Sequence, residues 1–376
     1  MTALRPDLDR AEPWPRSVLV IADVVGATQF ISFLRPLTDL ARAGALRLHF
    51  TKHEKDPSAL TALFESLSPD LLVFSRYTHG NAGDLAARAR EKNIPIVFHI
   101  DDDLLNVPMS LGADKFAHYN RPDRLAALRA NMNAADVVYA STTALAEAFV
   151  RDDIAVPIIA GDLYCSIDPA TLPLPIPATL PVLGYMGTGG HNEDLAMVLP
   201  AIARLMDEMP GLRFETFGTV SMPEELRRFG GRIAHHPPIA NYAAFLERLS
   251  ILGWWVGLAP LVDNAFNRCK ADTKWVEYSY AGTAVVASDI PVYHRGCADG
   301  AGILCSEPQH WYDALRATLR DLDLRNQMVA NARSRLVSDY SHHRLQQQIL
   351  DVFSAAGRHA GAHRASAGTD QTRGRS

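Results

Sequence analysis

The sequence is poor in three features that would each point to a particular class of protein. Its four cysteines, Cys165, Cys269, Cys297 and Cys305, form no Cys-x-x-Cys pair, which fits a reducing compartment. Lysine and arginine (37 residues) do not exceed aspartate and glutamate (42), and a net charge of −5 gives no electrostatic case for a nucleic-acid partner. No apolar run approaches the roughly 18 residues of a membrane span. Residues 1–17 also lack the apolar segment of a secretory signal, so we expect a cytoplasmic protein.

Hydrophobic residues are plentiful, at 48% of 376 residues, and they alternate between strand-like and helix-like patterns. The length exceeds the roughly 250–300 residues at which one core stops growing, so two domains are expected. Apolar, β-branched runs predict strands at 17–22, 46–50, 70–75, 94–100, 136–140, 156–160, 182–186, 212–217, 233–235, 254–260 and 284–288. Helical patterns lie at 26–43, 60–67, 83–92, 122–133, 142–150, 195–209, 271–281, 311–319, 324–337 and 342–353. Alternation of this kind predicts parallel sheets in an α/β fold.

The alternation stops between residues 161 and 181, where five prolines predict an extended linker. We therefore expect an N-terminal Rossmann-like domain (1–165), a linker (166–181), a C-terminal Rossmann-like domain (182–340), a helix (341–356) and a disordered basic tail (357–376). In open parallel sheets, ligands bind beyond the carboxyl ends of the strands. Functional residues are therefore expected in loops that follow strands, facing a cleft between the two domains.

A glycine-rich loop follows the first strand of the second domain and precedes a helical stripe. Gly187, Thr188, Gly189 and Gly190 form this loop, and Asn192 is a plausible N-cap. Glycines let the backbone approach a ligand closely, and free amides at a helix start attract phosphate oxygens. The alternative is a tight strand-to-helix turn with no ligand. No Walker lysine follows the loop.

A second candidate site lies on the helix predicted at 271–281 and just before it. At 100° per residue, Lys270, Lys274 and Glu277 would fall within about 60° of one another. Two cations and a carboxylate on one face suit a nucleoside diphosphate, because lysines neutralise phosphates and a carboxylate accepts hydrogen bonds from ribose. The alternative is a surface ion pair between Lys274 and Glu277. The apolar strands on either side favour a half-buried helix near the cleft.

These segments resemble the retaining GT-B glycosyltransferases of the glycosyltransferase-4 type. The resemblance is carried by the pattern Lys270-x3-Lys274-x2-Glu277-Tyr278-x3-Gly282, followed after two residues by Val285-Val-Ala-Ser-Asp289. Gly184-Tyr-Met-Gly187 and the strand end Ile100-Asp-Asp-Asp-Leu104 are similar as well. More narrowly, Asp101-Asp-Asp-Leu104 and the segment Asn267-Arg-x-Lys-x-Asp-x-Lys-Trp-x-Glu-Tyr278 resemble bacterial surface-polysaccharide members. The second domain is covered well, over about residues 182–353, and the first only in outline.

The resemblance implies the donor side of the site. It implies a GT-B fold of two doubly wound domains, with Glu277 on the ribose of a nucleotide sugar and counted among the catalytic residues. Asn267 and Arg268 belong to the same donor segment. The family pattern has a second glutamate eight positions before the ribose glutamate, but Cys269 stands there, which leaves the contacts to the sugar open.

The resemblance also implies the acceptor side. Asp101 and Asp102 occupy the positions of a His-Asp pair that faces the acceptor and the leaving sugar, so either is a candidate catalytic group that orients or deprotonates a hydroxyl. His99, Asp103 and Gly26 are expected on the acceptor side. The alternative is that Asp102 or Asp103 only caps a turn.

Asp101-x-Asp103 also matches the metal motif of GT-A enzymes. The two-domain alternation and the lysines Lys270 and Lys274 argue against that reading, so neither a metal nor a cofactor is expected.

The leading hypothesis is a glycosyltransferase that transfers a sugar from a nucleotide-diphosphate sugar to a glycan or lipid-linked acceptor, with retention and without a metal. Transient peripheral contact with the inner membrane would follow from such an acceptor. Two alternatives are a nucleotide-sugar epimerase of the same architecture and a non-catalytic GT-B scaffold that binds a partner or glycan.

Overall fold

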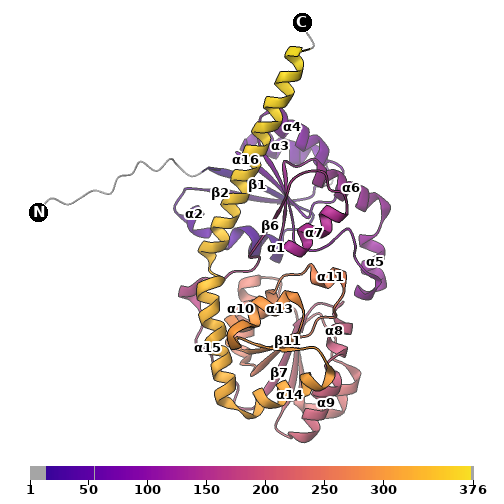
Figure 1. The fold of residues 1–376 in the computed structure, drawn as a ribbon, viewed down its shortest axis with the longest axis vertical. Helices are drawn as coiled ribbons and strands as arrows, with labels where there is room; N and C mark the ends of the chain where they lie inside the picture. The colour runs from indigo at the N-terminus through magenta and orange to yellow at the C-terminus, as the bar shows by residue number, and fades with distance from the viewer. Residues whose placement is uncertain (1–13, 55, 374–376) are drawn as a thin grey trace, which may run out of the picture.

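The computed structural model describes residues 14–54 and 56–373. It contains two six-stranded parallel sheets, one in each domain (Figure 1). The first sheet has the order β2-β1-β3-β4-β5-β6 and the second the order β12-β11-β10-β7-β8-β9. The strands of the first sheet are β1 Ser17–Ala22, β2 Arg47–Lys52, β3 Leu71–Ser75, β4 Ile96–Ile100, β5 Val137–Ala140 and β6 Ile158–Ala160. Those of the second are β7 Val182–Gly187, β8 Arg213–Gly218, β9 Ile233–His236, β10 Val256–Ala259, β11 Ala284–Ser288 and β12 Ile303–Cys305.

Helices connect the strands of both sheets. The first domain has α1 Ala27–Gln29, a π-helix η1 Phe30–Leu34, α2 Thr38–Arg42, α3 Pro57–Leu67, α4 Ala82–Glu91, α5 Ala113–Tyr119, α6 Pro122–Asn133 and α7 Thr143–Arg151. The second has α8 Asn192–Ala196, α9 Leu199–Glu208, α10 Tyr242–Leu252, α11 Ala265–Arg268, α12 Thr273–Tyr280, α13 Pro291–Cys297, α14 Pro308–Arg320 and α15 Leu322–Asp339. Short 3₁₀ turns are η2 Met109–Leu111, η3 Pro169–Thr171, η4 Glu224–Arg232 and η5 Ala298–Gly300.

Two predicted helices are broken in the structure. In place of the helix predicted at 26–43, the structure has the three short elements α1, η1 and α2. In place of the helix predicted at 195–209, it has α8 and α9. Pro200 explains the second break, because it lies in the first turn of α9, where a proline costs no hydrogen bond.

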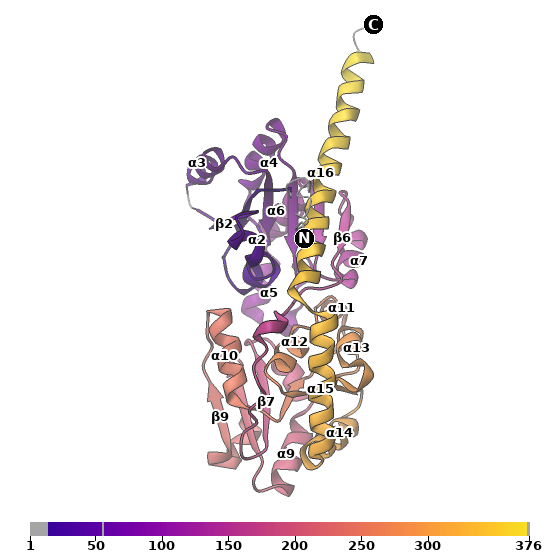
Figure 2. The same ribbon diagram turned by 90° about the vertical axis from the view of Figure 1, so that its left-hand side faces the viewer.

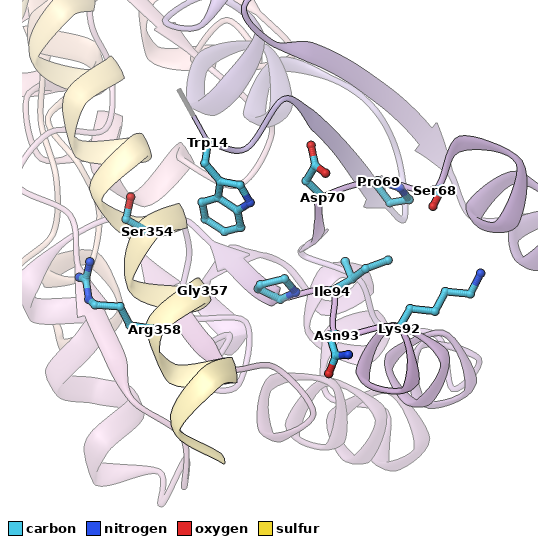
Figure 3. A pocket seen from close by; sticks show the side chains of 11 residues that line it. Trp14, Ser68, Pro69, Asp70, Lys92, Asn93, Ile94, Ser354, Gly357 and Arg358 are labelled. Carbon is cyan, nitrogen blue, oxygen red and sulfur yellow. The ribbon is translucent and has the colours of Figure 1, made fainter. Parts of the chain in front are cut away.

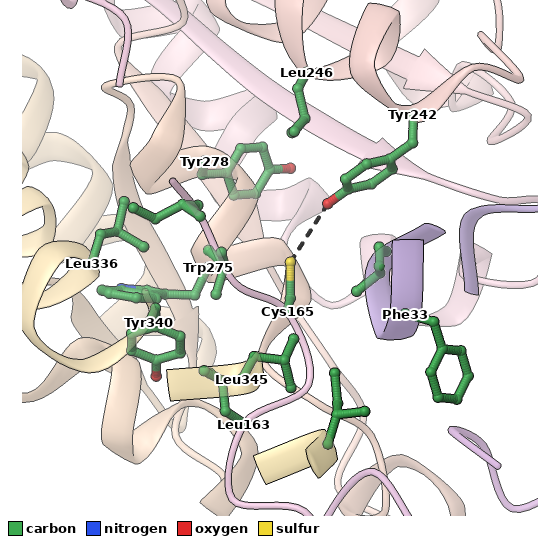
Figure 4. Close-up of a cluster of buried hydrophobic side chains, with 14 of the residues drawn as sticks. Phe33, Leu163, Cys165, Tyr242, Leu246, Trp275, Tyr278, Leu336, Tyr340 and Leu345 are labelled. Carbon is green, nitrogen blue, oxygen red and sulfur yellow. Dashed lines mark hydrogen bonds between the residues drawn. The ribbon is translucent and has the colours of Figure 1, made fainter. Parts of the chain in front are cut away.

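The central strands β1, β3, β4, β5 and β11 are buried along their whole length, which explains why they are continuous apolar runs. One hydrophobic cluster continues from the first sheet through the interdomain segment into the second domain. Figure 4 shows Phe33 of the first domain and Tyr278 and Trp275 of the second on either side of Cys165. The Tyr242 hydroxyl and the Cys165 thiol are 3.5 Å apart in the same cluster. Leu163, Cys165 and Ile167 are buried there, so the chain between the domains is packed rather than free.

The C-terminal helix α16, His342–Arg373, returns to the first domain. Figures 1 and 2 show α15 along the second domain and α16 along the first. Gln348 accepts hydrogen bonds from the backbone amides of Asp162 and Leu163, and Phe353 stacks on Phe33. The helix predicted at 341–356 thus runs on through 357–373, where we expected disorder. Its alanines, arginines and glutamine favour helix, and Ala360 is buried.

A cavity of about 880 Å³ lies between α16 and the amino ends of β3 and β4. Figure 3 shows Trp14, Asp70 and Arg358 around it. It is therefore at the opposite end of the sheet from the edge where ligands bind in such folds. No helix among the described residues is long and apolar enough to cross a membrane.

Candidate functional site

A second cavity, of about 480 Å³, lies between the carboxyl ends of the two sheets. Residues after β1, β3 and β4 form its first-domain wall, and residues after β7, β8 and β10 together with α12 form its second-domain wall. In both sheets the strand order reverses beside it, at β1/β3 and at β7/β10. The cavity is lined, among others, by Thr28, Arg76, Asp101, Asp102, Tyr164, Gly187, Thr188, His191, Tyr242, Lys270, Lys274 and Glu277.

The second-domain wall brings together the three residues that the sequence predicts as a donor site. Lys274 and Glu277 are on α12, but Lys270 is not: it lies in the turn between α11 and α12. The prediction of one continuous helical face was therefore wrong for Lys270. The reason is local, because α11 ends at Arg268 and α12 begins only at Thr273, so the chain changes direction between them. All three side chains nevertheless line the same cavity.

Burial controls the ionisation of these groups. Glu277 is 8% exposed, and its Oε1 accepts a hydrogen bond of 2.8 Å from the Tyr242 hydroxyl. Burial raises the pKa of Glu277 to about 7, against the opposing effects of that hydrogen bond and of Lys274. Burial likewise lowers the pKa of Lys274 to about 8. Among the residues that the structure describes, Lys274 has no ion-pair partner, and its ammonium group lies 5.4 Å from the Tyr185 ring centroid.

Only half of the glycine-rich loop reaches this cavity. Gly187 and Thr188 line it, whereas Gly189 and Gly190 do not. The Gly189 amide donates to the Thr219 hydroxyl at 2.8 Å, which is a structural contact. Gly190 has a φ of +152° and lies against the first domain, where a Cβ would come within 2.7 Å of Lys115 Nζ. Gly190 thus permits close approach of the two domains rather than of a ligand.

His191 follows this loop and is a cavity residue that the sequence analysis missed. Its Nδ1 lies 2.7 Å from Asp194 Oδ2, while Asp194 Oδ1 accepts from the Val262 amide at 2.8 Å. The positive charge of Lys274, together with burial, lowers the pKa of His191 to about 4. His191 is therefore a neutral group at physiological pH. A histidine directly after a glycine-rich strand-to-helix loop is the sequence signal that points to it.

The first-domain wall is an arginine–aspartate network. Arg76 Nη1 lies 3.0 Å from Asp101 Oδ1 and 3.6 Å from Asp102 Oδ2. The hydroxyls of Thr28 and Tyr164 both donate to Asp101 Oδ2, at 2.9 and 2.6 Å. Burial alone would raise the pKa of Asp101, but Arg76 and these hydrogen bonds hold it below its usual value. Asp101 is thus an ionised carboxylate whose Oδ2 accepts two hydrogen bonds, while its Oδ1 faces Arg76 and has no hydrogen-bond partner among the described residues.

Arg76 was not among the predicted residues, although it directly follows strand β3. Thr28 and Tyr164 were missed as well, because nothing in their local sequence marks them. Asp102 is the less engaged of the two aspartates. Its Oδ1 lies 3.4 Å from Lys270 Nζ, so this ion pair joins the two walls of the cavity.

Besides Gly189 and Gly190, five predicted residues lie outside the cavity. His99 is buried, its Nδ1 lies 2.9 Å from the Ser75 hydroxyl, and burial lowers its pKa to about 4. Asp103 is buried and accepts from Asn106. Asn267 donates to the Val262 carbonyl within its own loop, and Arg268 pairs with Asp263 on the surface. Gly26 lines a neighbouring cavity in the first domain.

Among the described ranges 14–54 and 56–373, no group of three His, Cys, Asp or Glu side chains is arranged to hold a metal ion. Cys269, at the position of the expected glutamate, is buried, and burial raises the pKa of its thiol to about 11. Its Sγ lies 3.3 Å from the Ala265 carbonyl oxygen, so it is a packing residue.

No protein-family model and no curated protein matches this sequence. Solved structures, in contrast, align with most of the chain. Anabaena Alr3699/HepE in complex with UDP-glucose gives a TM-score of 0.64 at 14% identity, covering 90% of this chain and 99% of that one. An E. coli protein bound with UDP-2-fluoro glucose gives 0.61 at 12% identity, over 90% and 98%. A glycosyltransferase from Rickettsia africae gives 0.59 at 10% identity, over 90% and 98%. This similarity confirms the predicted GT-B fold.

Proposed function

We propose that this protein is a glycosyltransferase that takes its sugar from a nucleotide-diphosphate donor. The observation that carries the proposal is the convergence of Lys270, Lys274 and Glu277 on one cavity at the carboxyl ends of both sheets. Two structures of the same fold were solved with UDP-glucose or UDP-2-fluoro glucose, which supports a uridine nucleotide as the first donor to test.

The donor would lie against the second-domain wall. The ammonium groups of Lys270 and Lys274, with the backbone at Gly187 and Thr188, suit the diphosphate. An ionised Glu277 would accept hydrogen bonds from the ribose hydroxyls. The two lysines and Arg76 supply the positive charge that stabilises the leaving nucleoside diphosphate, which is why we infer a transfer that needs no metal.

The acceptor would enter from the first-domain wall. Because Asp101 is engaged by Arg76, Thr28 and Tyr164, we assign it the role of orienting Arg76 toward the leaving group. Asp102 keeps more of its carboxylate open, so it is the better candidate to position the acceptor hydroxyl. Retention of configuration, a cytoplasmic location and a glycan or lipid-linked acceptor, reached by peripheral membrane contact, complete the proposal.

A donor panel tests this function. Thermal shift and calorimetry with UDP-, GDP-, ADP- and dTDP-sugars should single out one nucleotide, and Lys270→Ala should weaken its binding. The matched control is Arg42→Gln, which removes a surface guanidinium that is 78% exposed. Sugar transfer to an added acceptor supports the proposal. Conversion of the donor to an isomer without an acceptor, or binding without any turnover, would contradict it.

A further inference from the structure

The first domain contains a third cavity, of about 770 Å³, beside the one already described. It lies beyond the carboxyl ends of β1 and β3 and the start of α6. Its lining includes Asp23, Arg76, His79, Tyr119, Arg121 and Arg124. Ala27, Thr28 and Arg76 line both cavities, so the two spaces meet at these residues.

Arg124 is the unusual group in this cavity. Its side chain is only 12% exposed, and its guanidinium lies 4.8 Å from the centroid of the Tyr119 ring. Among residues 14–54 and 56–373, its side chain makes no hydrogen bond, and its Nε is buried without a partner. A guanidinium has five N–H donors, and leaving them unpaired in a buried place is unfavourable. The site is therefore open to a ligand that accepts several hydrogen bonds.

The nearest carboxylate does not satisfy Arg124. Asp23 Oδ2 is 3.5 Å from Arg124 Nη1, which is longer than a good hydrogen bond. Both oxygens of Asp23 are already used by Thr78, whose amide and hydroxyl donate at 2.8 and 2.6 Å. Asp23 thus fixes the loop after β3 and leaves the guanidinium facing the cavity.

Arg121 and Arg76 place further positive charge at the same cavity. Arg121 donates to both oxygens of Asp123 on the exposed rim. Burial lowers the pKa of Arg124 and Asp23 opposes this, while Arg76 and Arg121 lower the pKa further, so both of these guanidinium groups repel that of Arg124. Guanidinium groups bind phosphate oxygens in a bidentate way, and a phosphate would remove this repulsion.

We propose that the acceptor is phosphorylated and that Arg124, with Arg121, holds its phosphate in this cavity. This inference rests on the proposed glycosyltransferase function. A phosphate bound there would place the rest of the acceptor toward Thr28 and Arg76, where the cavity joins the donor cavity. Val24, which lines the cavity, is 74% exposed, so an apolar group attached to the phosphate could also be accommodated.

The test compares matched acceptors in the full-length protein, with the donor that the panel identifies. One arm uses a sugar with and without a phosphate group. The other uses the same sugar on a polyprenyl diphosphate in detergent micelles, which separates a water-soluble from a lipid-linked source. We expect a KM at least about tenfold lower for the phosphorylated acceptor, because hydrogen bonds between a guanidinium and a phosphate are charge-assisted and strengthen binding by at least that factor. Equal KM values for the two forms would overturn the inference.

Variants assign the effect to Arg124. Arg124→Gln should raise the KM for the phosphorylated acceptor by about tenfold or more, with the donor KM unchanged. Arg124→Lys should recover part of the loss, and Asp123→Asn should lower the KM because it removes a competing carboxylate. Arg42→Gln should change nothing. An Arg124→Gln protein that folds and keeps the wild-type KM, or loses the neutral and phosphorylated acceptors equally, would contradict the assignment.

A binding experiment separates this inference from the proposed function. Inorganic pyrophosphate is titrated into Lys270→Ala protein, in which the donor side is weakened, and into the same protein carrying Arg124→Gln. Binding lost with Arg124 supports the phosphate site even if no nucleotide sugar binds. Nucleotide-sugar binding to the wild type without any Arg124-dependent pyrophosphate binding would leave the function standing and overturn the phosphate site.

Discussion

The two walls of the central cavity differ in how their charges are balanced. On the second-domain wall, Lys274 is half-buried and has no ion-pair partner among the described residues, and burial raises the pKa of Glu277 to about 7. On the first-domain wall, Asp101 is already paired with Arg76 and two hydroxyls. The first-domain wall is therefore organised before any ligand arrives, whereas on the second-domain wall Asp194 and Glu277 act on Lys274 without forming an ion pair with it. A diphosphate would supply a direct counter-charge.

The largest expected effect comes from Glu277 on the second-domain wall. Glu277→Ala should lower kcat/KM by about a hundredfold or more while the protein stays folded, because a preorganised donor contact is lost. Steady-state kinetics and circular dichroism check this. Tyr242→Phe should lower kcat/KM less than Glu277→Ala does, because it removes only the hydroxyl that donates to Glu277. Rates close to wild type in Glu277→Ala would remove the donor site assigned here.

The same residue predicts a pH dependence. Burial raises the pKa of Glu277 from 4.5 to about 7, so kcat/KM should rise as the pH increases through about 7. For stability the sign is opposite: the folded state holds this proton more tightly than the unfolded chain, so the stability due to Glu277 is lost as the pH rises through about 7. Glu277→Gln should therefore raise the Tm relative to wild type at pH 8 but not at pH 4. A Tm difference that is independent of pH would contradict the buried carboxyl.

Lys270 joins the two walls and should give the next largest effect. Lys270→Ala should raise the donor KM and the Kd of the free nucleoside diphosphate by about tenfold to a hundredfold, because a charged phosphate contact is lost. Calorimetry with the nucleotide measures this. Asp102→Asn, which removes the partner at 3.4 Å, should not weaken nucleotide binding. Unchanged nucleotide affinity in Lys270→Ala would contradict its phosphate role.

Arg76 tests the first-domain wall. Arg76→Gln should lower kcat by about tenfold and leave the Kd of the nucleotide nearly unchanged, since Arg76 compensates charge in the transition state. Removing the guanidinium should also raise the pKa of Asp101, because burial is then less opposed. A pH–rate profile should show a limb due to Asp101 at higher pH than in the wild type, separate from the limb near pH 7 due to Glu277. A purely structural role would instead lower the Tm without moving that limb.

Arg268 should give the smallest effect. The sequence pattern places it in the donor segment, but its side chain is 55% exposed and pairs with Asp263 away from the cavity. Arg268→Ala should therefore change the donor KM by about twofold or less, as expected for a surface ion pair. A loss as large as that of Lys270→Ala would show that the donor site extends over α11.

Sequence reasoning was most successful where a function depends on neighbours along the chain. Lys274 and Glu277 are three residues apart on one helix, so their spacing alone predicts a shared face. The prediction was wrong for Lys270 because a turn separates α11 from α12, and no periodicity reveals where a short helix ends. Arg76 and Arg124 were missed because each is an ordinary arginine until the fold brings Asp101 or Asp23 beside it.

The sequence by itself determined the two parallel sheets, because buried parallel strands must be continuous apolar runs and their alternation with helices leaves little other choice. It also determined that polar residues after the strands would share an edge of each sheet. Only the tertiary structure decided which of these residues face one another. That choice depends on contacts between residues far apart in the chain, such as Thr28 with Asp101 and Lys270 with Asp102. The free energy of such contacts arises from burial and charge pairing in the folded molecule, which local sequence does not encode.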